Sequence, residues 1–253
     1  MTTKTIGIVS WFPQDEPVRG QRMGRFKKLL KQIDFYFPKF PIIVIAQNWN
    51  GFTPSCNNFL YVYKYPQLGI LRARKELRRR FLELGYDYLI MFDDDAIIEC
   101  SDDTALTEYF DRMDNNPNGF AFLKRENATS LPSYENPYVD SQLNLCTISR
   151  DILLQEDIPE VDPQRNIAYE DRILSMLLHT KYADREFDVP EGLRCTHFRS
   201  VTRPLPSTWA RDKKIKWDIL DVNTKALEKY LSEYKCLPSN IWDFLQGKNA
   251  EIH

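Results

Sequence analysis

Three consecutive aspartates, Asp93-Asp94-Asp95, directly follow the apolar run Tyr88-Leu89-Ile90-Met91-Phe92. In an extended backbone, Asp93 and Asp95 point to one side and Asp94 points to the other. Adjacent like charges after an apolar strand are unfavourable unless a cation or a network of donors compensates them, and hard divalent cations take oxygen ligands. The triplet therefore indicates a manganese or magnesium site. The alternative interpretation is a strand end followed by an Asx-type turn.

The elements around this triplet alternate between strand and helix. Apolar runs predict four strands, and periodic apolar positions predict two helices between them, at residues 5–10, 22–37, 41–46, 59–63, 69–85 and 88–92. Such alternation indicates an α/β fold with a mostly parallel, twisted sheet flanked by helices on both faces. Ligands of such sheets bind outside the carboxyl ends of the strands, where the aspartates are expected.

The second half of the sequence is less regular. Helices are predicted near 102–113, 169–180 and 222–234, and strands near 120–123, 143–148 and 193–197. A short amphipathic segment follows at the end of the chain. No linker or internal repeat divides the sequence, so we expect a single domain over 1–253.

Composition narrows the classes of function. The 253 residues carry a net charge of −2 and have a pI near 6.0, which gives no overall attraction to nucleic acid. The longest apolar runs fall far short of the roughly 20 residues of a membrane-spanning helix. The N-terminal residues show no signal-peptide pattern, and the five cysteines have neither zinc-ligand nor redox spacing. We therefore expect a soluble cytoplasmic protein whose thiols stay reduced.

Two segments resemble the centre of a GT-A-fold glycosyltransferase of the inverting family 2. They are Gly69-Ile70-Leu71-Arg72-Ala73-Arg74-Lys75 and the stretch from Gly85-Tyr86-Asp87 through Asp93-Asp94-Asp95. The resemblance implies a GT-A-like fold that binds a nucleotide-sugar donor through a divalent metal. It implies Asp95 as a metal ligand, Asp93 as a metal or donor contact, and Asp94 and Arg74 as donor-binding residues.

The resemblance also assigns roles in the second half of the chain. Glu170-Asp171 resembles the acidic pair that inverting members place at the start of a helix facing the acceptor. Asp171 would then be the general base that accepts the proton of the acceptor hydroxyl, with Glu170 beside it. Acidic residues also stabilise the first turn of any helix, which is the simpler interpretation. His197 ends a strand-like run and is implied as a further metal ligand, although a lone histidine is more often structural.

The sequence departs from the family pattern at two strand ends. After the second strand, where the family has an aspartate that reads the nucleobase, this chain has Ala46-Gln47-Asn48-Trp49-Asn50. Gln47 or Asn48 can still hydrogen-bond a uracil edge, so a UDP-sugar is the expected donor. The first strand ends in Ser10-Trp11-Phe12-Pro13, where the family commonly has Pro-Thr, and Ser10 is expected to contact the donor.

A basic segment, 199–217, holds six arginines and lysines and two tryptophans. It fits a lid over the donor diphosphate, a contact with a lipid-diphosphate acceptor at the inner face of the membrane, or a solvated loop. By the resemblance, 1–100 forms the nucleotide-sugar-binding half, 101–220 the acceptor-binding half and 221–253 a C-terminal helical extension.

These features favour a metal-dependent hexosyltransferase of polysaccharide biosynthesis that acts on a saccharide or lipid-linked saccharide. One alternative is a phosphatase of the haloacid dehalogenase type that uses Asp93 and Asp95. That family places its nucleophile strand first in the chain and expects Thr or Val where Ile97 stands. Another alternative is a non-catalytic module that binds a nucleotide sugar or a carbohydrate.

Overall fold

A six-stranded sheet with the order β3-β2-β1-β4-β7-β6 forms the centre of the computed structural model, which describes residues 1–123, 142–157 and 170–197. Strands β1 to β4 are parallel, and β7 is antiparallel to both of its neighbours. The strands span β1 (Lys4–Trp11), β2 (Ile42–Gln47), β3 (Leu60–Tyr65), β4 (Tyr88–Asp93), β6 (Phe120–Leu123) and β7 (Gln142–Ser149). The predicted α/β class with a mostly parallel central sheet is confirmed.

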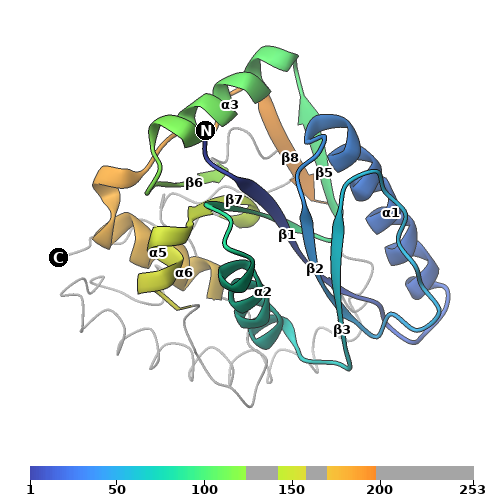
Figure 1. The fold of residues 1–253 in the computed structure, drawn as a ribbon. Helices are drawn as coiled ribbons and strands as arrows, with labels where there is room; N and C mark the ends of the chain where they lie inside the picture. Colours follow the sequence, from blue (N-terminus) through green and yellow to red (C-terminus); the bar gives the residue numbers. More distant parts are fainter. Residues whose placement is uncertain (124–141, 158–169, 198–253) are drawn as a thin grey trace, which may run out of the picture.

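Helices α1 (Val18–Tyr36) and α2 (Ile70–Leu84) pack on opposite faces of this sheet (Figure 1). Strand β2 shows the reason, because all six of its residues are buried and successive side chains point to opposite faces. Ile42 and Val44 join the hydrophobic core under α1, whereas Ile43 and Ile45 join the core under α2. A continuous apolar run is therefore what a strand covered on both faces requires.

Helix α2 begins and ends at glycines with positive φ. Gly69 precedes the helix with φ 81°, and Gly85 follows it with φ 78° in the left-handed conformation. The Gly85 N–H donates to the carbonyl oxygen of Phe81 at 3.2 Å, which satisfies one of the last carbonyls of the helix. These glycines set the length of α2 and hence the place of its first turns at the carboxyl end of the sheet.

The remaining described elements surround the second half of the sheet. Strands β5 and β8 form a separate antiparallel pair. The elements are β5 (Ala96–Cys100), α3 (Asp103–Asn115), α5 (Arg150–Gln155), α6 (Glu170–Lys181), the 3-10 helix η2 (Ala183–Arg185) and β8 (Leu193–His197). Asp102 caps α3 by accepting a hydrogen bond from the backbone N–H of Ala105 at 3.0 Å.

The structure differs from the predicted elements mainly around the aspartates. The chain turns after β4 and enters β5, which was not predicted, and Ala96 and Ile98 of β5 are buried in the core under α1. Helix α5 was also not predicted, and α1 begins at Val18 instead of Arg22. The predicted helix 222–234 lies outside the described residues, and the division into two halves and a C-terminal extension stays a prediction. Among the described helices, none is both long and apolar enough to cross a bilayer.

Candidate functional site

A cavity of about 380 Å³ opens at the carboxyl ends of the parallel strands. From β1 the chain proceeds to β2 and β3 on one side, and then returns to place β4 on the other side of β1. Open α/β sheets bind their ligands outside the strand ends at such a reversal. The cavity is lined by Val9, Trp11, Arg22, Gln47, Gln67, Gly69, Ile70, Arg74, Asp93, Asp94 and Asp95.

Four of the lining residues project from one face of the sheet. Val9 pairs with Asp93 across β1 and β4, and Trp11 pairs with Gln47 across β1 and β2. Val9 and Trp11 are two positions apart on one strand, so all four side chains lie on the face that α2 covers. Gln47 and Asp93 are then two strand spacings, about 10 Å, apart across the sheet, and two residues, about 7 Å, apart along it. The cavity thus has an amide end at β2 and an acidic end at β4.

Asp93 ends β4 and lies at the cavity with a third (33%) of its side chain exposed. Its Oδ1 is 3.4 Å from Nη2 of Arg74, which lies in the first turns of α2 and is mostly buried. Asp93 and Arg74 therefore meet at the cavity wall, as the sequence-based assignment of both to donor binding requires. The assignment itself stays a prediction.

Asp94 points toward α1 instead. Its Oδ1 is 2.5 Å from Nη2 of Arg22, and its Oδ2 accepts a hydrogen bond from the backbone N–H of Trp11 at 3.1 Å. Burial raises the pKa of Asp94 to about 6, an effect that Arg22 opposes and the neighbouring Asp95 strengthens, while a hydrogen bond from the Ser10 hydroxyl lowers the pKa. Both carboxylate oxygens have protein partners, so Asp94 connects β1, α1 and the aspartate turn.

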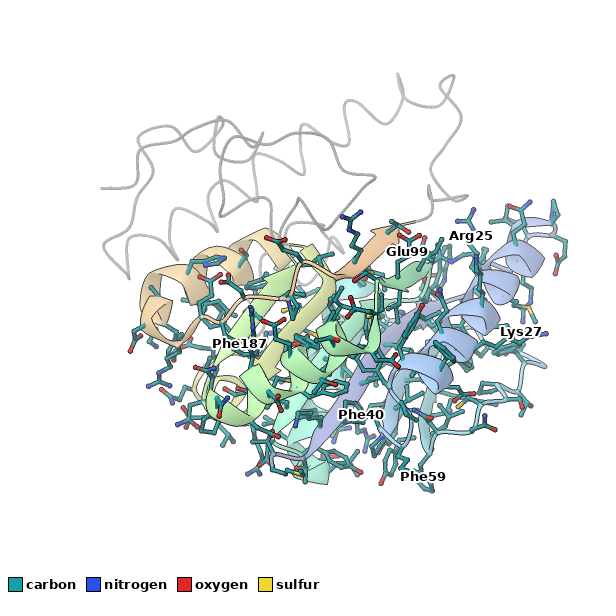
Figure 2. The ribbon with its side chains drawn as sticks, turned by 90° about the horizontal axis from the view of Figure 1, so that it is seen from above. Arg25, Lys27, Phe40, Phe59, Glu99 and Phe187 are labelled. Atoms are coloured by element: carbon teal, nitrogen blue, oxygen red, sulfur yellow. The ribbon has the colours of Figure 1, made fainter. Side chains whose placement is uncertain are left out.

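Asp95 is buried, and its Oδ2 is 4.0 Å from Nη1 of Arg25 in α1. The expectation that Asp95 points to the same side as Asp93 does not hold, because β4 ends at Asp93 and the next two residues form a turn. Asp94 and Asp95 consequently both face arginines of α1. Figure 2 shows Arg25 on the side of the molecule where Glu99 of β5 also lies.

The donor set at this turn suits a hard divalent cation. Asp93 and Asp95 bring two carboxylates to one cavity, and β8 places the Cα of His197 opposite Ala96, the residue after Asp95. Two carboxylates and an imidazole are acceptable ligands for manganese. Among the described side chains, which do not include that of His197, no three acidic, histidine or cysteine residues form a ready-made metal site. Asp95, Asp93 and His197 as metal ligands stay a prediction.

Ser10 and Gln47 were both predicted to contact the donor. Ser10 is fully buried. Its hydroxyl accepts a hydrogen bond from Nε1 of Trp49 at 3.2 Å and donates a hydrogen bond to the carboxylate of Asp94. It therefore supports Asp94 from within the protein and is not part of the cavity wall. Gln47 is part of that wall, although only 2% of the residue is exposed. Whether either residue contacts a donor stays a prediction.

The predicted catalytic pair lies at the start of α6. Glu170 and Asp171 are the first two residues of this helix, and their side chains are outside the described part of the structure. Their roles as catalytic residues stay predictions. The basic segment 199–217 lies entirely outside the described residues.

The sequence analysis missed Trp11, Arg22 and Arg25. Trp11 is the last residue of β1 and lines the cavity, and its ring lies 5.8 Å from the guanidinium carbon of Arg22. Arg22 and Arg25 are three residues apart on α1, a spacing that places both on one side of a helix. That spacing was a usable signal, but only the fold shows that this side faces the aspartates.

No protein-family model and no curated protein matches the chain. Many solved structures are similar to it, and three of them are described here. A protein from Bacillus anthracis described as a glucose-1-phosphate thymidylyltransferase has 12% identity and a TM-score of 0.49, over 77% of this chain and 89% of that chain. A protein from Desulfovibrio desulfuricans described as a nucleotide-diphospho-sugar transferase has 9% identity and a TM-score of 0.46, over 91% and 99%. A glycosyltransferase involved in glycosylation of the major capsid of PBCV-1 has 12% identity and a TM-score of 0.43, over 84% and 99%. Likenesses this distant carry no activity from one chain to another, so the function is argued from the residues of the site.

Proposed function

We propose that the protein is a metal-dependent glycosyltransferase that uses a nucleotide-diphosphate sugar as its donor. The observation that supports this most is the meeting of Asp93, Asp95 and Arg74 at one cavity, at the reversal of strand order. Carboxylates hold a divalent cation, and a guanidinium binds phosphate oxygens through several donors at once. The diphosphate of the donor is an anion when it binds and when it leaves. A cation held by the carboxylates and the guanidinium of Arg74 would both stabilise that negative charge.

The donor half of the mechanism follows from these positions. Asp93, Asp95 and His197 would hold a divalent cation, which would supply charge stabilisation to the departing nucleoside diphosphate. Arg74 donates hydrogen bonds to the diphosphate, and Asp93 holds the guanidinium at the cavity wall before the donor arrives. Arg22 stays with Asp94 and keeps the aspartate turn in place.

The acceptor half of the mechanism rests on α6. Asp171 takes the proton from the acceptor hydroxyl while that oxygen forms a bond to the anomeric carbon and the bond from this carbon to the diphosphate oxygen breaks. Attack from the face opposite the diphosphate gives an inverted anomeric centre. Glu170 lines the acceptor side. The acceptor is a saccharide, free or lipid-linked, and segment 199–217 contacts the membrane surface in the lipid-linked case.

Binding of the donor nucleotide tests the first half. A nucleoside diphosphate with manganese should raise the unfolding temperature, because binding at a hundredfold excess over Kd adds about 2.7 kcal/mol to the stability. EDTA should remove the effect, and so should Asp95→Ala. Asp111→Ala on α3 is the matched control, since Asp111 is an exposed acid outside the cavity and its loss should leave the effect intact.

Turnover tests the second half. Asp171→Asn should retain donor binding while sugar transfer falls by a factor of roughly 100 to 10,000, the range for loss of a general base. An equal loss of binding would contradict the assignment of Asp171. Cleavage of a generic phosphate ester without any nucleotide binding would favour the phosphatase. Nucleotide-sugar binding without transfer or donor hydrolysis would favour the non-catalytic module.

A further inference from the structure

Each of the three consecutive aspartates lies near a different arginine of α1 or α2. The pairs are Arg74 with Asp93 at 3.4 Å, Arg22 with Asp94 at 2.5 Å and Arg25 with Asp95 at 4.0 Å, measured from a guanidinium nitrogen to a carboxylate oxygen. When all six groups are ionised, their charges sum to zero. A cation that reaches this cluster therefore does not meet three uncompensated negative charges.

Arg25 makes the loosest of the three contacts. Its Nη1 lies 4.0 Å from Oδ2 of Asp95, which is too far for a hydrogen bond between these two atoms. The side chain of Asp95 is 5% exposed and that of Arg25 is 20% exposed, so water screens the two charges poorly. Arg25 thus acts on Asp95 through its charge, and Asp95 is also the proposed metal ligand.

The position of Arg25 disfavours a divalent cation that arrives alone. A cation bound to Oδ2 of Asp95 would lie within about 6 Å of Nη1 of Arg25, because metal–oxygen bonds are about 2 Å long. Even at the dielectric constant of water, about 80, the repulsion between a double and a single positive charge at this distance lowers affinity roughly tenfold. At a mostly buried site the loss is larger. Arg25 and the cation therefore compete for one carboxylate.

A diphosphate changes this balance. Its oxygens are ligands for a hard divalent cation and acceptors for guanidinium groups, and its negative charge offsets that of the cation. We propose that Arg25 keeps a lone divalent cation out of the site, so that the cation enters as its complex with the diphosphate of the nucleotide. The inference rests on the proposed function and gives Arg25, which the sequence analysis missed, control over when the metal binds.

Equilibrium dialysis against manganese chloride measures cation binding directly and needs no turnover. Wild type should retain little manganese alone, and much more when one of UDP, CDP, ADP and GDP binds with it. Arg25→Gln removes the charge and keeps a polar side chain. This variant should bind manganese without nucleotide at least about tenfold more tightly than wild type. A purely structural role of Arg25 predicts the opposite sign, because damage beside Asp95 would weaken a metal site.

Two control variants separate the charge beside Asp95 from other effects. Arg25→Lys keeps the positive charge and should bind manganese as weakly as wild type. Lys31→Gln removes a charge from an exposed position of the same helix, about 9 Å further along its axis, and should also resemble wild type. The melting temperature of each variant in EDTA checks that it is folded. If Arg25→Gln does not fold, Arg25→Met, which keeps an apolar stem, takes its place.

The outcomes separate this inference from the proposed function. If no nucleoside diphosphate binds with or without manganese, the proposed function is wrong and this inference fails with it. If nucleotides bind, but wild type holds manganese equally well without them, the inference alone is overturned. The same follows if the neutral variant of Arg25 binds manganese no more tightly than wild type. An equal gain in Lys31→Gln or in Arg25→Lys would also overturn it, because the effect would then not come from the charge beside Asp95.

Discussion

Replacing Asp94 with asparagine should change how stability depends on pH. Burial raises the pKa of Asp94 from 3.8 to about 6 against the opposing effect of Arg22. A folded-state pKa above the unfolded one means that the native state binds the proton more tightly, so stability is highest below 3.8 and is lost as the pH rises through 6. The rise corresponds to about 3 kcal/mol, because each pKa unit is worth about 1.4 kcal/mol.

Urea unfolding of wild type and Asp94→Asn, in EDTA at several pH values from 4 to 8, isolates this effect. Groups distant from Asp94 titrate alike in the two proteins, and the loss of the Asp94 charge beside Arg22 changes the stability by an amount that does not depend on pH in this range. The stability of the variant relative to wild type should therefore increase by about 2.5 kcal/mol from pH 4 to pH 8, because wild type has already lost a small part of the effect at pH 4. Asp114→Asn is the control. Burial raises the pKa of Asp114, but hydrogen bonds from Lys4 and Thr2 outweigh this and hold it at about 2, so its difference from wild type should stay constant above pH 5. Parallel profiles for wild type and Asp94→Asn would refute the reasoning.

Two further predictions concern the core beneath the site. A Cβ at Gly7 would lie 2.7 Å from Leu89 and 2.9 Å from Leu77, so Gly7→Ala should destabilise the fold by about 1–3 kcal/mol through overpacking between β1 and α2. A melting temperature lowered by at least about 2 °C checks this, and an unchanged one would contradict it. Phe12 is fully buried and stacks on Trp49 with ring centroids 5.1 Å apart, so Phe12→Ala should cost about 3–5 kcal/mol. Urea unfolding measures that cost, and a loss below 1 kcal/mol would show that the aromatic cluster closes around the gap.

The sequence was sufficient to predict the parallel half of the sheet. Strands β2 and β4 are apolar up to their last residues, Gln47 and Asp93, which is typical of strands covered on both faces, and α2 is marked by its apolar spacing and by Gly85. Strand β5 was missed because it is short and follows an acidic triplet that normally ends a strand. Its burial comes from contact with α1, which precedes it by some sixty residues and is not visible in the local pattern.

The candidate site was predictable only in part. The aspartates and Arg74 stand out by residue type and by their place after an apolar strand and within a helix. The partner of Asp94, by contrast, is 72 positions away, and a pairing over that distance depends on the packing of α1. The side-chain amide oxygen of Gln47 likewise accepts a hydrogen bond from the backbone N–H of Gly69 at the start of α2, which the fold brings to the end of β2. Long-range geometry of this kind has no counterpart in local sequence patterns.

The two helices on opposite faces of the sheet each contribute an arginine to the aspartate triplet, α1 through Arg22 to Asp94 and α2 through Arg74 to Asp93. A chain in which either helix has detached holds an incomplete site. Only molecules in which both helices are in place would then bind nucleotide. A bound nucleotide would therefore slow hydrogen exchange in α1 and in α2 together, although the two helices pack on opposite faces of the sheet. The bound nucleotide would thus stabilise the packing of both helices on the sheet, although the sheet separates one helix from the other.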